Sequence, residues 1–115
     1  QAFRATSGAA TRRKDIYWLR KQARAQGYDV QLKDVTEDEA VIGVMGPLAR
    51  EILQALSADD WDTFAFSTAQ NVTVAGLPAT ATRLSFVGEL GWEIAVHTAD
   101  TIPSFCEKAE DPSPD

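Results

Sequence analysis

The chain has 115 residues, of which 44% are hydrophobic and 24% are charged, a composition typical of one folded domain with a modest core rather than of a disordered chain. Its formal net charge of -6 argues against a general nucleic-acid-binding role, because affinity for the phosphate backbone needs clustered lysine and arginine side chains. No apolar run approaches the roughly 20 residues that span a bilayer, and the single cysteine, Cys106, excludes an intrachain disulfide framework and fits a reducing compartment.

The N-terminal part predicts a short strand and a basic helix. Residues 3–7 alternate weakly and are expected to form a strand. Thr11 is placed to cap a helix over residues 12–26, which Gly27 ends. The apolar stripe of this helix consists of Ile16, Leu19 and Ala23. The helix also carries six of the eleven basic residues, which favours a solvated face over the alternative, an anion-binding or partner-facing patch.

The middle of the chain predicts two strands and a second helix. Residues 29–35 alternate and indicate a half-buried strand, followed by a turn at residues 36–38. Residues 40–45 form a nearly continuous apolar run, which is typical of a central strand covered on both faces. Gly46 and Pro47 end this strand and begin a helix, because proline suits the first helical position. The expected apolar stripe of that helix is Leu48, Ile52, Leu53 and Leu56.

The C-terminal half predicts an antiparallel meander. Residues 57–70 form a long connection, anchored by the aromatic residues Trp61, Phe64 and Phe66. Three strands are expected, over residues 71–75, 79–87 and 91–97. A helix is predicted to start within residues 101–108, and residues 110–115 are expected to be a disordered tail after a domain over residues 1–109. The fold class is therefore α+β, with a ferredoxin-like strand-helix-strand-strand-helix half followed by an antiparallel meander.

Several kinds of chemistry are excluded by motif. The chain has neither a GxGxxG dinucleotide fingerprint nor a GxxxxGK[ST] phosphate loop. With His97 and Cys106 each alone in the sequence, a zinc site or a cysteine-histidine nucleophilic pair is not expected. No residue is therefore assigned a catalytic or metal-binding role.

A conspicuous carboxylate follows a glycine-rich loop. If residues 88–91 form a four-residue hairpin loop, Phe86 and Glu93 lie opposite each other on one face of the sheet, among apolar neighbours. A carboxylate on such a face costs free energy unless hydrogen-bond donors meet it. The N-H edge of a heteroaromatic ring such as a pterin could supply these donors. The alternative, which spacing alone favours, is that Glu93 points to solvent and Phe86 belongs to the core.

Three segments resemble the glycine cleavage T-protein (aminomethyltransferase) family. Residues 86–94, FVGELGWEI, preceded by Arg83, resemble the family's signature motif, and residues 44–53, VMGPLAREIL, resemble its Gly-Pro stretch. Residues 3–10 and 15–19 are similar to the segment that precedes both, especially in dimethylglycine and sarcosine dehydrogenases. Together the resemblance covers residues 3 to 98.

This resemblance implies binding of tetrahydrofolate and transfer of a one-carbon unit to it from an aminomethyl group or an oxidised N-methyl amine. Carried over by position, Glu93 hydrogen-bonds the pterin, and Phe86 stands where the family often has tyrosine. Trp92 and Arg83, from the same signature, complete the expected folate site. Residues of the parent polypeptide and the small-molecule folate are the expected partners, without nucleic acid or membrane.

The chain also departs from the family. An essential aspartate that the family places upstream of the segment matching Phe3, and a C-terminal barrel that closes over folate, are not in this sequence, which begins with Gln1. We therefore expect a piece of a longer protein that does not catalyse by itself, located in the cytoplasm, or in the mitochondrion of a eukaryote. Two alternatives stay open: a folate-binding module without transferase activity, as in family members that support iron-sulfur cluster assembly, and a structural domain that has lost the ligand.

Overall fold

A computed structural model describes residues 1–85 and 87–99, in two compact units, Gln1–Val35 and a second unit that starts at Thr36. Each unit is considered by itself. The expected helix start within residues 101–108 and the expected tail at residues 110–115 lie outside the described residues. None of the described helices is both long and apolar enough to cross a membrane.

The first unit confirms the basic helix. A single 3-10 turn, η1 (Ala9–Thr11), leads into α1 (Arg12–Ala25). The helix ends in a Schellman motif: Gly27 has a φ of 68°, its N-H donates to Arg24 O at 3.1 Å, and the N-H of Tyr28 donates to Ala23 O at 2.9 Å. Glycine suits this left-handed position because it has no Cβ.

The two strands predicted in this unit are wrong. Neither residues 3–7 nor residues 29–35 form a strand, because among the described residues no neighbouring strand supplies the backbone partners that an extended segment needs. Residues 29–35 are instead tied to the helix by a side-chain contact, in which Arg12 Nε donates to Asp34 Oδ2 at 2.8 Å.

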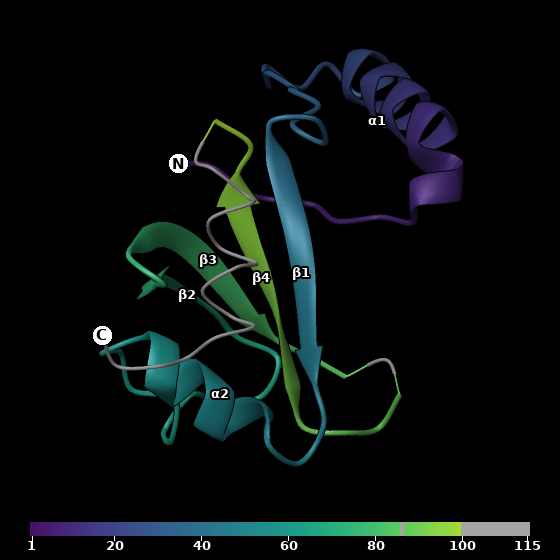
Figure 1. Ribbon diagram of the computed structural model, residues 1–115. Helices are drawn as coiled ribbons and strands as arrows, with labels where there is room; N and C mark the ends of the chain where they lie inside the picture. Colours follow the sequence, from purple (N-terminus) through teal and green to yellow (C-terminus); the bar gives the residue numbers. More distant parts are fainter. Residues whose placement is uncertain (86, 100–115) are drawn as a thin grey trace. The chain divides into compact units, whose positions relative to one another are not determined.

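The second unit is a four-stranded antiparallel sheet with one helix, which confirms the α+β class and the C-terminal meander. Its elements are β1 (Glu39–Met45), α2 (Ala49–Leu56), β2 (Ala69–Val74), β3 (Leu77–Arg83) and β4 (Gly91–His97). The strand order is β1-β4-β3-β2, as Figure 1 shows. The expectation that β1 is central and covered on both faces is wrong: β4 already has β3 on its other side, so β1 lies at the edge of this sheet and Val41 is 55% exposed.

Helix α2 starts two residues later than expected. Gly46 has a φ of 122° and its carbonyl accepts the N-H of Ala49 at 3.1 Å, so Pro47 lies in the preceding turn rather than at the first helical position. This shift rotates the buried stripe. Ala49 and Leu53 are buried with Leu56 packed beside them, whereas Leu48 and Ile52 are exposed.

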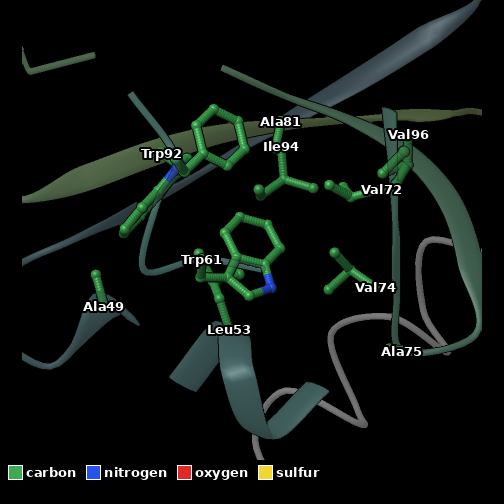
Figure 2. Close-up of a cluster of buried hydrophobic side chains, with 12 residues drawn as sticks. Ala49, Leu53, Trp61, Val72, Val74, Ala75, Ala81, Trp92, Ile94 and Val96 are labelled. Atoms are coloured by element: carbon green, nitrogen blue, oxygen red, sulfur yellow. The ribbon is translucent and has the colours of Figure 1, made fainter. Parts of the chain in front are cut away.

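An aromatic cluster fills the core between the sheet and the segment after α2. Trp61 and Phe64 are fully buried, as the sequence predicts, whereas Phe66 is 62% exposed. The Trp61 ring stacks on Phe64 with centroids 5.7 Å apart and meets Trp92 edge-on at 5.5 Å. Figure 2 shows Trp61 between Leu53 of α2 and Ile94 of β4, with Trp92 to one side of them. Aromatic pairs in this geometry contribute stability beyond their buried area.

Candidate functional site

The register between β3 and β4 differs from the predicted one. Glu93 lies opposite Thr82, and Trp92 lies opposite Arg83, so the predicted pairing of Glu93 with Phe86 is wrong. The connection between the strands is seven residues long, residues 84–90, rather than four. Phe86 itself lies outside the described residues.

Contacts from a distant segment explain why β3 ends early. The backbone N-H of Arg83 donates to Thr68 O at 2.9 Å, and the N-H of Ser67 donates to Arg83 O at 2.8 Å. Since these bonds lie on the side of Arg83 away from β4, they fix the last residue of β3 and the start of the loop. Ala79 and Ala81 face Val96 and Ile94 on the core side, but their alternation identifies the buried face and not the register.

Glu93 lies on the sheet face that points away from the core. Residues along β4 alternate, with Trp92, Ile94 and Val96 buried and Glu93 half-buried between them. Its cross-strand neighbours are Gly43 on β1 and Thr82 on β3. Within residues 1–85 and 87–99, no side chain or backbone group forms a hydrogen bond or ion pair with the Glu93 carboxylate. Among these residues, no donor is therefore bound to the acceptor oxygens of the half-buried Glu93.

Trp92 lies on the opposite face from Glu93, in the centre of the core. Its ring is fully buried, and two guanidinium groups lie over it, those of Arg50 and Arg83, at 5.7 and 5.6 Å from the ring centroid. Such cation-π contacts are favourable and orient both partners. Trp92 thus anchors the strand that carries Glu93.

Arg83 also belongs to the core side of the sheet. Its Nη1 donates to the backbone carbonyl of Phe64, and its guanidinium covers Trp92. Arg83, at the end of β3, therefore contacts both the aromatic segment and β4. The structure places Arg83 and Trp92 together on one face and Glu93 on the other.

The glycine-rich loop meets the turn before α2. Gly46 donates its backbone N-H to Leu90 O at 2.8 Å, and a Cβ added to Gly46 would lie 3.5 Å from Glu89 Oε2. A shallow hollow opens beside the loop, lined by Phe66, Arg83, Leu84, Ser85 and residues 88–91. Glu89 is exposed. Among the described residues, no group of three or more histidine, cysteine or acidic side chains is arranged to hold a metal ion.

Gly43 belongs in the sequence to a nearly continuous apolar run and carries no functional motif. Its position opposite Glu93 emerges only from the pairing of β1 with β4, two strands that lie about fifty residues apart in the chain. The signal in the sequence was a glycine in the middle of an otherwise strand-forming run, which weakens a strand and marks a close approach of another group.

Comparison with known proteins finds one matching family model and relatives over most of this chain. The family model described as the GCVT N-terminal domain matches residues 1–107. The chain is 37% identical over 102 residues to human mitochondrial dimethylglycine dehydrogenase, an alignment that covers 87% of this chain and 12% of the relative. It is 46% identical over 82 residues to mouse mitochondrial sarcosine dehydrogenase, covering 70% of this chain and 9% of the relative.

A shorter relative shows the same similarity. The aminomethyltransferase of Alkaliphilus metalliredigens is 34% identical over 90 residues, which cover 77% of this chain and 24% of the relative. The chain thus spans about a tenth of the dehydrogenases and about a quarter of the aminomethyltransferase that it matches.

Proposed function

This chain belongs to the family of the GCVT N-terminal domain, and we propose from this membership that it is part of a tetrahydrofolate-dependent one-carbon transferase. In this proposal the chain contributes one wall of the folate site to a longer protein. The chain supplies the groups that bind and orient the pterin. Other parts of the longer protein supply the catalytic acid.

The observation that carries the proposal is the state of Glu93. A half-buried carboxylate without a partner among the described residues loses part of its hydration and gains no donor from those residues in return. Two adjacent N-H groups on the edge of a flat ring would match its two oxygens, and hydrogen bonds to a charged acceptor are stronger than neutral ones. The two acceptor oxygens on this face therefore match the N-H edge of a pterin.

The other predicted site residues take supporting roles in this proposal. Trp92 and Arg83 lie beneath the sheet and hold β4 in register, so they position Glu93 rather than contact the ring. Tetrahydrofolate, when bound, supplies the nitrogen atoms that accept the one-carbon unit.

The names of the relatives indicate a class of donor. Two of them are dehydrogenases of dimethylglycine and sarcosine, and a third is an aminomethyltransferase. We therefore propose that the one-carbon unit comes from the N-methyl or aminomethyl group of a small amino acid. The corresponding compartment is the cytoplasm, or the mitochondrion in a eukaryote, in line with the mitochondrial dehydrogenases.

A matched pair of variants tests the proposal in the full-length protein that contains this chain. Glu93→Gln keeps the shape of the side chain but replaces one acceptor oxygen with a donor, which strands an N-H group of the ring. This mismatch should cost about 1 to 3 kcal/mol, or roughly 5-fold to 150-fold in affinity. Glu89→Gln is the control, because Glu89 lies exposed in the loop and should change affinity much less.

Calorimetric titration with a reduced folate such as 5-formyltetrahydrofolate measures both affinities. Equal dissociation constants for Glu93→Gln and the unmodified protein would remove Glu93 from the site. A larger loss for Glu89→Gln than for Glu93→Gln would move the site to the loop.

A further inference from the structure

Neither the backbone conformation nor the packing at Gly43 requires a glycine. It lies in the middle of β1 and its φ is not in the left-handed region, so its backbone conformation suits any residue. A Cβ added there would meet nothing closer than Met45 Cε at 3.9 Å, an ordinary contact. A glycine inside a strand destabilises the fold by roughly 0.5 to 1 kcal/mol relative to alanine. The fold would thus be served better by a larger residue.

Gly91, on the neighbouring strand, shows the contrast. A Cβ at Gly91 would fall 2.0 Å from Met45 Sδ and 2.9 Å from the backbone oxygen of Val44. Gly91 is therefore required by packing within the sheet. No such contact exists at Gly43 within the described residues, so packing does not require glycine at that position.

Gly43 lies on the sheet face that points away from the core. Val41 and Met45, two residues before and after Gly43, project on the same side of β1. Val41 is 55% exposed, and Met45 reaches back toward Gly43 with its methyl group. Glu93 lies directly across the strand pair, where opposed side chains are about 5 Å apart. Among the described residues, Gly43 is therefore flanked by two apolar side chains along β1 and by one carboxylate across the strand pair.

The opposite side of Glu93 is less suited to a flat ligand. Thr82, the neighbour on β3, carries a branched side chain that stands up from the sheet. The next threonine on that face, Thr80, is engaged in a hydrogen bond with Asn71 at 3.3 Å. A ring that presents its edge to Glu93 therefore finds room above β1 rather than above β3.

We propose that the pterin ring rests on the backbone of Gly43, its seat. The lack of a side chain at Gly43 then sets the size of the ligand that Glu93 can bind. The ring lies flat on the Gly43 backbone, between Val41 and Met45, with its N-H edge toward the Glu93 carboxylate. Thioether and aliphatic groups at the rim of a ring make favourable contacts. This inference rests on the proposed folate function and adds the side of Glu93 on which the ring lies.

Three substitutions in the full-length protein test the inference. Gly43→Val places two methyl groups in the seat, and it should leave the melting temperature equal or higher because valine favours strands. Its affinity for 5-formyltetrahydrofolate should fall by about tenfold or more, which corresponds to at least about 1.4 kcal/mol. Gly43→Ala should give a smaller loss. Thr82→Val, the matched control on the other side of Glu93, should bind within about threefold of the unmodified protein.

The outcomes separate this inference from the proposed function. If the unmodified protein binds reduced folate and Gly43→Val binds it equally well, the seat is wrong while the folate function stands. If Thr82→Val loses as much affinity as Gly43→Val, the ring lies over β3 and the inference is overturned. If the unmodified protein does not bind reduced folate, the proposed function fails and the seat fails with it. Should Gly43→Val not fold, Gly43→Ala decides: unchanged affinity would overturn the inference.

Discussion

Replacing Arg83 by methionine tests how much Arg83 stabilises the fold by joining the end of β3 to the aromatic segment, a role called the latch below. The variant loses the hydrogen bond from a charged donor to the Phe64 carbonyl, worth about 1.5 to 3 kcal/mol. It also loses the cation-π contact with Trp92 at 5.6 Å, worth roughly 0.5 to 2 kcal/mol. Against these losses, Arg83 Nε is buried without a hydrogen-bond partner in the described structure, and its removal returns about 1 to 3 kcal/mol of desolvation.

Central values of these contributions give a net expected loss for Arg83→Met of about 1.5 kcal/mol in the free energy of unfolding. Urea unfolding of the 115-residue chain, followed by circular dichroism and extrapolated to water, measures it. Arg20→Met is the control, because Arg20 is exposed on α1 and forms no hydrogen bond or ion pair with any described residue; it should change stability by less than about 0.5 kcal/mol. A change of that small size for Arg83→Met as well would refute the latch.

Two further predictions concern α2 and the segment after it. Leu53→Ala should cost about 2 to 5 kcal/mol because Leu53 is fully buried, whereas Ile52→Ala, at 45% exposure, should cost less than about 1 kcal/mol; equal losses in urea unfolding would show that the helix faces the core differently. The Thr63 hydroxyl, with backbone amides, holds the pKa of Asp60 below its ordinary value of 3.8, so the stability from this contact is present above that pH and is lost as the pH falls through the lowered pKa. Thr63→Val should therefore raise the pKa of Asp60 toward 3.8 in an NMR titration, and an unchanged pKa would argue against the hydroxyl as the main cause.

The elements defined by local signals could be predicted from the sequence. The stop of α1 follows from Gly27, since only glycine takes the left-handed conformation there without cost. The buried positions of Trp61 and Phe64 follow from the size of their apolar rings. The antiparallel meander follows from three apolar runs separated by short turn signals. The end of α1 is decided by interactions within a few residues of Gly27.

The features that failed depend on distant partners. Residues 29–35 alternate as a strand does, but alternation describes one face and does not supply a neighbouring strand. The end of β3 is set by backbone bonds to Ser67 and Thr68, which no local pattern near Arg83 reveals. The phase of α2 depends on the conformation of Gly46, which delays the first helical turn.

The candidate site, like the fold, could be predicted only in part from the sequence. The signature motif identified Glu93, and the strand alternation around it predicted a change of face at each residue. The neighbours of Glu93 were not predictable, because they follow from the pairing of β4 with β1 and β3. The role proposed for Gly43 depends on its pairing with Glu93 across the strands.

The most direct test of the account is a crystal structure of the full-length protein with a bound reduced folate. The account predicts that two N-H groups of the pterin lie within about 3 Å of the Glu93 carboxylate oxygens, with the ring resting on Gly43 between Val41 and Met45. A pterin bound elsewhere, with the Glu93 carboxylate in contact with water or with another protein group, would contradict it.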